Sequence, residues 1–300
     1  MRALPKLSGL AVLPALILSA QNIRVDTTLV VIPVTVTDPN NRFVLGLDKG
    51  DFKIFEDGVE QKISIFTGED APLSVGILFD TSGSMDLRTD MSHRAVSEFL
   101  KTMSPQDEAF LVQFSDKPQM IEEFTNQTNE IEARLSDLKM GGLTALLDSV
   151  ELGVREMKKA KNPRKALVVV SDGGDNNSRY TATDIRDIVK EADTQIYAMG
   201  VFEPTFFAGL PGEIVSGPKL LAQIADQTGG RAFGASEFSQ LPAIAEKIAI
   251  ELRNQYVLAY YPANSARDGK YRKVEVKIGQ PKGLPALKAR WRLGYYAPLE

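Results

Sequence analysis

Residues 77–86 read ILFDTSGSMD, and this stretch decides how the rest of the chain is interpreted. An apolar run leads straight into Asp80, and Ser82 and Ser84 follow within four residues. A buried strand gains nothing from a carboxylate and two hydroxyl groups at its tip, because polar atoms that leave water need partners. The stretch therefore predicts a buried strand whose carboxyl end supplies oxygen ligands to a binding site.

Continuous apolar runs of the same kind recur along the middle of the chain, as AFLVQFS, KALVVVSD and QIYAMGV. Such runs are typical of strands that are buried on both faces of a parallel sheet. Apolar stripes with helical spacing occur at residues 96–103, 147–157 and 241–252. Strands that alternate with helices predict an α/β domain with a doubly wound, mainly parallel, Rossmann-like sheet, which we expect to span residues 72–254.

Antiparallel β segments are expected on both sides of this domain. Every second residue is apolar in residues 30–36, and Asp57-Gly58 between two apolar runs is a hairpin signal. The last part of the chain alternates in the same way. Neither flank has enough strands to cover a hydrophobic face alone. We therefore expect the module at residues 21–71 and the segment at residues 255–300 to pair into one small β-sandwich.

The first 20 residues have the pattern of a signal peptide. Arg2 and Lys6 precede an apolar stretch at residues 10–18, and small residues lead to a cut after Ala20. The stretch is too short to span a membrane comfortably. We expect an exported protein, periplasmic, on the cell surface or extracellular, with no stable membrane span once the signal is removed. An uncleaved anchor is the alternative, because Leu18 is large for its position before the cut.

The composition excludes several classes of site. The chain has no cysteine and one histidine, which excludes disulfides, thiolate chemistry and multi-histidine zinc sites, and argues against a Ser-His-Asp triad. With 35 basic and 39 acidic residues the net charge is −4, so no nucleic-acid partner is expected. The basic residues between 158 and 165 are interpreted as a solvated loop, and His93 as a helix-surface residue. We expect that the protein is not an enzyme.

Asp172 extends the oxygen-rich patch. It follows the apolar run ALVVVS as Asp80 follows its own run, and open α/β sheets bind ligands at the carboxyl ends of their strands. Two carboxylates and the hydroxyls of Ser82 and Ser84 are hard oxygen donors, which suit Mg²⁺, Mn²⁺ or Ca²⁺ better than zinc. They supply only part of a coordination shell, so water and an outside ligand would complete it.

With these residues in view, DTSGSM resembles the Asp-x-Ser-x-Ser signature of von Willebrand factor type A (VWA) domains, which carry a metal-ion-dependent adhesion site (MIDAS). Thr144 in GGLTALLDSV matches the family's metal-binding threonine, and Asp172 in VVVSDGGDN matches its second aspartate. Residues 220–233 resemble a late segment of these domains, so the resemblance covers about residues 74–254. The flanks resemble a bacterial exported subfamily, through VDTTLVVIPVTVTD, FKIFEDGVEQKISIF and YYPANSARDGKYRKVEVKIG.

The resemblance implies a metal site and a way of binding. Ser82, Ser84 and Thr144 would contact the cation, and Asp80 and Asp172 would hold it directly or through water. In relatives the open position takes a carboxylate from a partner, so the expected partner is a protein that presents an acidic residue. The expected function is metal-dependent adhesion or assembly. The alternative is a structural subunit of an envelope complex in which the metal stabilises the fold, and the oligomeric state stays open.

Two further segments lie near the expected metal. Residues 201–219 form a long connection that either contacts the partner through an apolar rim or packs over the domain's own core. The rim candidates are Phe202, Phe206, Phe207 and Leu210. The sequence DGGDNNS fails the EF-hand spacing, so we expect Asp175, Asn176 and Asn177 to cap the next helix or to shape their loop. Asp86 is expected near the metal without binding it.

Overall fold

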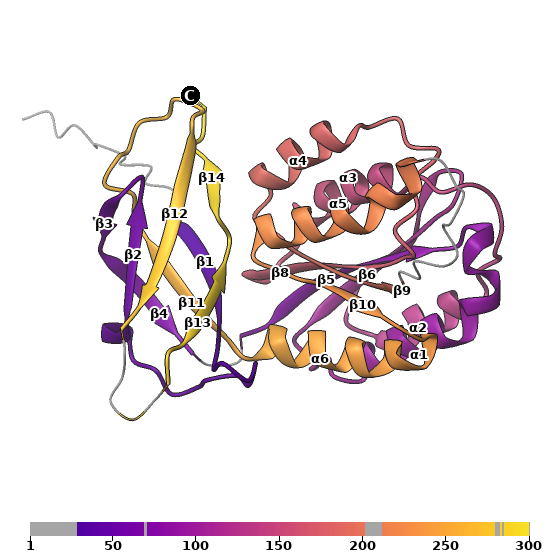
Figure 1. Cartoon of the computed structure of the whole chain (residues 1–300), viewed down its shortest axis with the longest axis horizontal. Helices are drawn as coiled ribbons and strands as arrows, with labels where there is room; N and C mark the ends of the chain where they lie inside the picture. Colours follow the sequence, from indigo (N-terminus) through magenta and orange to yellow (C-terminus); the bar gives the residue numbers. More distant parts are fainter. Residues whose placement is uncertain (1–28, 69–70, 202–211, 280–282, 284, 300) are drawn as a thin grey trace, which may run out of the picture.

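The computed structural model describes residues 29–68, 71–201, 212–279, 283 and 285–299 and shows an α/β domain beside an all-β unit (Figure 1). The α/β domain contains the strands β5 (Leu73–Asp80), β6 (Glu108–Phe114), β7 (Pro118–Thr125), β8 (Arg164–Val170), β9 (Gln195–Val201) and β10 (Ala232–Ala235). They form one sheet in the order β10-β9-β8-β5-β6-β7, in which only the edge strand β7 is antiparallel to its neighbour. The predicted mainly parallel sheet is confirmed.

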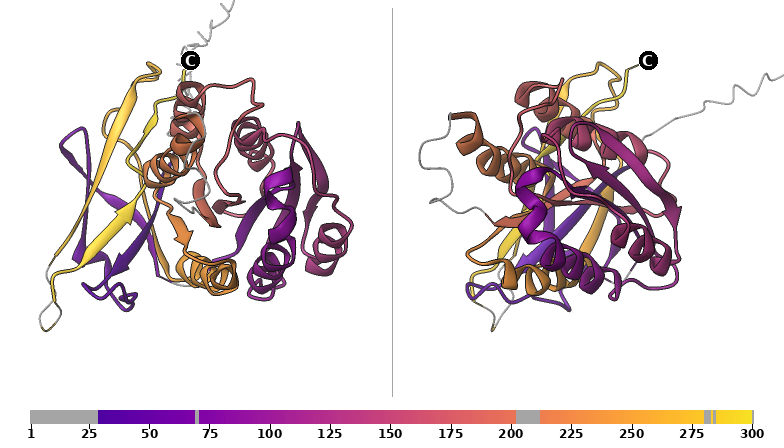
Figure 2. Two further views of the ribbon diagram at one scale, coloured as in Figure 1. Left: turned by 45° about the vertical axis from the view of Figure 1, so that its right-hand side comes forward. Right: turned by 90° about the vertical axis from the view of Figure 1, so that its right-hand side faces the viewer.

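Helices cover both faces of this sheet (Figure 2). One face carries α1 (Thr89–Leu100), α2 (Thr128–Ser136) and α6 (Leu241–Arg253), and the other carries α3 (Leu146–Met157), α4 (Ala182–Glu191) and α5 (Gly212–Thr228). All eight residues of β5 are buried, because helices cover this central strand on both sides. The apolar run that opened the sequence therefore lies in the middle of the domain.

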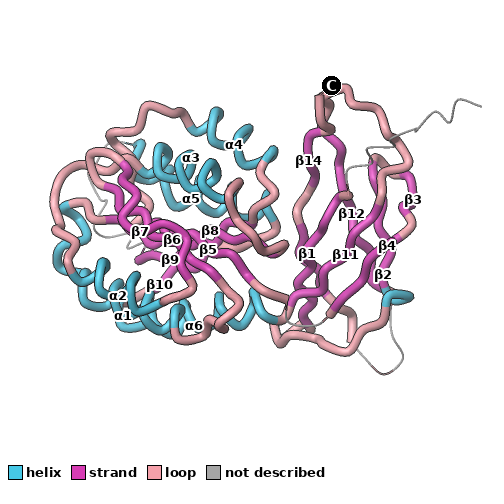
Figure 3. The backbone as a smooth tube through the Cα atoms, turned by 180° about the vertical axis from the view of Figure 1, so that it is seen from behind, coloured by secondary structure: helices cyan, strands magenta, loops and turns pink. Residues whose placement is uncertain are grey.

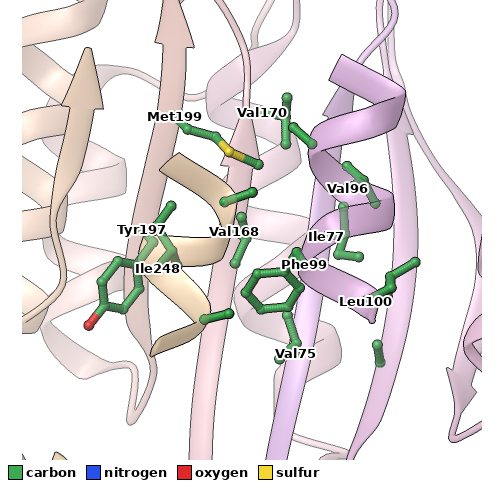
Figure 4. Close-up of a cluster of buried hydrophobic side chains, with 14 of the residues drawn as sticks. Val75, Ile77, Val96, Phe99, Leu100, Val168, Val170, Tyr197, Met199 and Ile248 are labelled. Carbon is green, nitrogen blue, oxygen red and sulfur yellow. The ribbon is translucent and has the colours of Figure 1, made fainter. Parts of the chain in front are cut away.

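Phe99 shows how the predicted helical stripes meet the sheet. Its side chain is 2% exposed and lies among Val75 and Ile77 of β5 and Val168 of β8 (Figure 4). Ile248 of α6 belongs to the same cluster, so α1 and α6 share one layer against the strands. The apolar stripes predicted at residues 96–103 and 241–252 are thus the helix faces that pack against the sheet.

The two flanks pair into one β-sandwich, as the sequence predicted (Figure 3). Its strands are β1 (Val30–Thr37), β2 (Phe52–Glu56), β3 (Val59–Gln61), β4 (Ile63–Thr67), β11 (Gln255–Tyr260), β12 (Tyr271–Ile278), β13 (Lys288–Trp291) and β14 (Gly294–Tyr296). The two sheets have the orders β13-β1-β11-β4 and β14-β12-β2-β3, so each combines strands from both flanks. Ile32, Ile54, Leu258 and Val276 belong to the hydrophobic core between them.

The predicted hairpin is present but shorter than the sequence indicated. Asp57 and Gly58 have φ values of 48° and 84°, the left-handed pair that a tight two-residue turn between antiparallel strands requires. This turn joins β2 to β3, and after Lys62 the chain crosses to the other sheet, where β4 pairs with β11. Ile63 then faces the sandwich core from the sheet that contains β11. Both sheets therefore take apolar core residues from this one run of sequence.

The alternation in residues 30–36 is typical of a half-buried strand, but β1 is more deeply buried than that. Its burial pattern places all but two of its residues in the interior. One face packs in the sandwich core, and on the other Thr35 accepts a hydrogen bond from Gln255 Nε2 at 3.2 Å. Gln255 Nε2 also lies 3.2 Å from the hydroxyl of Tyr197 in β9. The second face of β1 therefore lies against the α/β domain.

Arg164 corrects a second expectation. The basic residues 158–165 were expected to be solvated, yet Arg164 is 2% exposed at the start of β8. Its guanidinium donates to the carbonyl oxygens of Leu252 at 3.4 Å and Gln255 at 2.9 Å, where α6 passes into β11. The Leu252 carbonyl lies in the last turn of α6, where it accepts no hydrogen bond within the helix, and the buried guanidinium supplies a donor to it.

His93 in α1 is half-buried rather than a surface residue. Its ring centroid lies 5.2 Å from that of Phe79, and its buried Nε2 has no hydrogen-bond partner among the described residues. Burial lowers the pKa of His93, and the negative charge of Asp90 opposes this effect. The ring therefore packs as a largely neutral aromatic group.

In the part of the chain that the structure describes, no helix is long and apolar enough to cross a membrane. The predicted signal peptide at residues 1–20 lies outside the described residues, as do the four candidate rim residues.

Candidate metal centre

Three loops meet at the carboxyl edge of the central strands. Asp80 ends β5, Asp172 lies two residues beyond β8, and Thr144 lies two residues before α3. Strands β5 and β8 are parallel neighbours with Phe79 opposite Val170, so the residues that follow them lie side by side. The register therefore brings the two predicted aspartates to one point of the sheet edge.

The first loop turns its hydroxyl groups toward each other. Asp80 Oδ1 accepts a hydrogen bond from the backbone N–H of Ser82 at 2.9 Å, which fixes the turn directly after β5. The chain then enters the short 3-10 helix η2 (Gly83–Arg88), and Ser82 Oγ lies 3.1 Å from Ser84 Oγ. Two hydroxyl oxygens at this spacing can both face one cation.

Hydrogen bonds tie the other two loops together around Thr144. The Thr144 N–H donates to Asn176 Oδ1 at 2.8 Å, and its carbonyl oxygen accepts from the N–H groups of Asn176 and Asn177, each at 3.0 Å. The Gly83 N–H donates to the carbonyl of Gly142 at 3.1 Å, which links the first loop to the second. The structure thus gathers all five candidate ligands, Asp80, Ser82, Ser84, Thr144 and Asp172, at one sheet edge; their role as ligands stays a prediction.

The two carboxylates make this edge electrostatically unfavourable on its own. Asp80 is 0% exposed, and burial together with the negative charge of Asp172 raises its pKa to about 7. Hydrogen bonds from Ser171, whose Oγ lies 2.6 Å from Asp80 Oδ2, and from Ser82 oppose the rise without cancelling it. A cation between the two carboxylates would remove the repulsion, and the hydroxyl and carboxylate donors fit a hard divalent ion.

Hydroxyl groups are essential to such a site in this chain. Among the described residues, no three histidine, cysteine, aspartate or glutamate side chains come close enough to hold a metal by themselves. A metal at Asp80 and Asp172 would therefore rely on Ser82, Ser84, Thr144, water and an external ligand.

Asp116 is a part of the site that the sequence analysis missed. Its Oδ1 accepts the N–H of Leu143 at 2.8 Å, and its carbonyl oxygen accepts Asn177 Nδ2 at 2.7 Å. A Cβ on Gly142 would lie 2.9 Å from Asp116 Oδ1, so the loop closes directly against the carboxylate. Asp116 follows the apolar run of β6 as Asp172 follows that of β8, and this repeated pattern could have identified it.

Replacing Asp116 by alanine is expected to weaken Mg²⁺ binding about tenfold, because the loop that presents Thr144 loses the side-chain acceptor of the Leu143 N–H. Calorimetric titration of the full chain measures the change. Lys117→Ala, one residue along the same exposed turn, is the matched control and should bind as the wild type does. Equal affinity in Asp116→Ala would show that the remaining backbone hydrogen bonds hold the loop alone.

The residues of DGGDNNS shape the loops and do not cap the next helix. Asp175 Oδ1 accepts the N–H of Leu147 at 3.3 Å and lies 2.5 Å from Ser178 Oγ, so it caps the earlier helix α3. Helix α4 instead has Thr181 as its N-cap, whose side chain accepts from the Asp184 N–H. Asp86 is exposed in η2.

Comparisons with known proteins agree with this geometry. The family model described as the von Willebrand factor type A domain matches residues 75–174, a range that contains all five candidate ligands. No curated protein matches the chain. The solved structures described next are at most 17% identical to the chain, so their similarity concerns the fold alone.

The proximal thread matrix protein 1 from the mussel byssus is 16% identical, with a TM-score of 0.52, over 66% of this chain and 51% of its own. A structure of that protein with a zinc-occupied MIDAS motif is 15% identical, with a TM-score of 0.51, over 66% of this chain and 49% of its own. A D319A mutant of the PilB minor pilin from Streptococcus sanguinis is 17% identical, with a TM-score of 0.49, over 63% of each chain.

The chain thus spans about half the length of the mussel protein and less than two thirds of the pilin. The family match, the mainly parallel sheet and the loops at its carboxyl edge agree with one another. Residues 75–174 of the α/β domain are thus similar to the von Willebrand factor type A domain, and the mainly parallel sheet is consistent with the fold of that family.

Proposed function

We propose that the protein is a metal-dependent protein-binding module for adhesion or assembly. It binds a divalent cation through Asp80, Ser82, Ser84, Thr144 and Asp172 and uses the open coordination position to take a carboxylate from a partner protein. The observation that carries this proposal is the buried pair of carboxylates, which lies among hydroxyl groups at one sheet edge and repels itself without a cation.

Mg²⁺ is the proposed ion, with Mn²⁺ or Ca²⁺ as substitutes, because every donor of the site is a hard oxygen. The zinc-occupied MIDAS motif of the mussel protein supports a divalent cation at such a site and leaves the choice of ion to the donors. Two carboxylates and neutral hydroxyls leave a bound divalent ion able to attract one more anion, which favours an acidic side chain as the outside ligand.

Export and a binding role without catalysis complete the proposal. The basic start, short apolar stretch and small residues at positions 1–20 support export. The single histidine and the absence of cysteine in the sequence support a binding role rather than an enzymatic one. A second candidate function is that of a structural subunit in an envelope complex, with the metal stabilising the VWA domain.

The test is affinity capture from a surface and envelope extract of the source organism, with the full chain as bait in Mg²⁺ and Asp172→Asn as the matched bait. We expect a partner that only the wild-type bait retains, that EDTA releases, and that no longer binds after its carboxyl groups are amidated. A partner that stays bound in EDTA would support the structural subunit. Equal capture by the two baits would contradict the metal-bridged carboxylate.

A further inference from the structure

We propose that a cavity between the α/β domain and the β-sandwich binds a small oxyanion, a phosphate or a carboxylate, which contacts both units. The cavity has a volume of about 350 Å³, and its walls include Thr35, Thr37, Arg231, Glu251, Lys288 and Arg290. Arg231 lies at the amino end of β10, whereas the candidate metal centre lies at the carboxyl ends of the parallel strands β5 and β8. The proposed anion site is therefore separate from the metal centre and independent of the proposed function.

The register of two strands forms one wall of the cavity. Strands β1 and β13 are antiparallel, with Thr35 opposite Arg290 and Thr37 opposite Lys288. Directly opposite residues have their side chains on the same face of a sheet, as do residues two positions apart. Two hydroxyl groups and two cationic groups of the sandwich therefore lie together on one face. Arg290 donates to the Gly230 carbonyl at 3.2 Å, so this face meets the α/β domain.

The α/β domain supplies the opposite wall, and positive charge exceeds negative charge around the cavity. Glu251 is fully buried in α6, and its Oε2 pairs with the Arg231 guanidinium at 3.3 Å. Arg290 pairs with Asp226 at 2.6 Å. Lys288 is exposed and has no ion pair among the described residues. One positive charge is therefore left without a partner, and it lies between two arginines.

The donors that remain suit an oxyanion. Arg231 and Arg290 make these ion pairs through Nη1, and no hydrogen bond from their other guanidinium nitrogens is found within the described part of the chain. A guanidinium has five N–H donors, whose planar arrangement matches a carboxylate or a phosphate. The cavity is also within the size range of small-molecule sites.

A polar row beside the cavity adds a further donor. Gln255 lies opposite Thr35 on the other side of β1, and its Nε2 donates to Thr35 Oγ1 at 3.2 Å. Because this oxygen already accepts a hydrogen bond, the hydroxyl hydrogen of Thr35 can be donated to a ligand. The buried Oε1 of Gln255 has no hydrogen-bond partner among the described residues, and such atoms commonly mark bound water or a ligand that completes the polar network.

The test is calorimetric titration of the full chain with sodium phosphate and, separately, with sodium succinate. EDTA is present so that no metal holds the anion, and NaCl keeps the ionic strength constant. We expect at least one anion to bind and to raise Tm; binding of phosphate alone would assign the site to phosphoryl ligands, and binding of succinate alone to carboxylates. Lys288→Gln should weaken this binding about tenfold, because a charge-assisted contact is lost, and Lys288→Arg should retain it.

Lys273→Gln is the matched control, because Lys273 is an exposed lysine of β12 in the other sheet of the sandwich. It should bind the anion as the wild type does. Absence of binding by both anions, or an equal rise in Tm with NaCl alone, would overturn the proposal. Wild-type affinity in Lys288→Gln would do so as well, since the anion would then lie outside this cavity.

Discussion

Asp80→Asn is expected to abolish the stabilisation that Mg²⁺ gives to the wild-type chain and to lower Mg²⁺ affinity at least about 100-fold. The substitution keeps the shape of the side chain but removes the negative charge that is 0% exposed beside Asp172. At a Mg²⁺ concentration 100 times its dissociation constant, a bound ion stabilises a folded protein by about 2.7 kcal/mol. For a chain of 300 residues that corresponds to a rise in Tm of roughly 4 °C.

Without metal, the wild type should no longer be the more stable of the two proteins. Without a cation, Asp80 and Asp172 repel each other, so Asp80→Asn in EDTA should be about as stable as the wild type or slightly more stable. Thermal melts in EDTA and in a Mg²⁺ series, with calorimetric titration beside them, measure both effects. Asp86→Asn is the matched control, because Asp86 is an exposed acid of the same loop and should keep the full Mg²⁺ response. A wild-type Mg²⁺ response that survives in Asp80→Asn would place the ion elsewhere.

Gly230→Ala is expected to destabilise the protein by about 3 kcal/mol or more, at the upper end of what overpacking costs. A Cβ at this position would lie 2.1 Å from the carbonyl oxygen of Ile196 and 2.7 Å from its carbonyl carbon. These are backbone atoms of β9, which is paired with a strand on each side, and they cannot rotate away as a side chain can. The N–H of Gly230 also donates to the Ala225 carbonyl at 3.0 Å, so the glycine cannot shift without losing a hydrogen bond.

Urea unfolding followed by circular dichroism and by the fluorescence of Trp291, the single tryptophan, measures this loss. Trp291 lies in β13, so its signal reports on the sandwich, whereas the helical signal reports on the α/β domain. Gly50→Ala is the control, because a Cβ there meets nothing within 4 Å, and it should change stability by less than about 0.5 kcal/mol. Wild-type stability in Gly230→Ala would mean that β9 and β10 separate more easily than their register indicates.

The sequence located the centre of the site because that information is local. Asp80, Ser82 and Ser84 lie within five residues, and their loop follows a strand whose burial the apolar run already shows. Asp172 repeats the pattern after a second strand of the same type, so a parallel sheet brings it close. Thr144 had no such local signal and was identified only through the resemblance to VWA domains.

Residues that act through distant partners were missed or misread. Asp116 supports the Thr144 loop through a contact with Leu143, 27 residues away along the chain. Arg164 was grouped with solvated lysines, but it reaches Gln255, 91 residues further on. His93 lies in α1 and packs against Phe79 of β5, a contact that the apolar spacing of the helix did not predict. In each case the side chain's environment comes from another element, and no periodicity within its own segment encodes that environment.

By itself, the sequence determined the α/β class, the layers of the central sheet and the oxygen-rich edge, because apolar runs and stripes report burial within a single element. It also required the flanks to pair, since neither could cover its own apolar face. The tertiary structure alone decided that β4 leaves its hairpin for the other sheet and that β1 is buried on both faces. It also decided how Asp116 and Asn176 fix the loop that carries the candidate ligand Thr144. These outcomes depend on contacts between segments far apart in the chain, whose geometry exists only once the chain has folded.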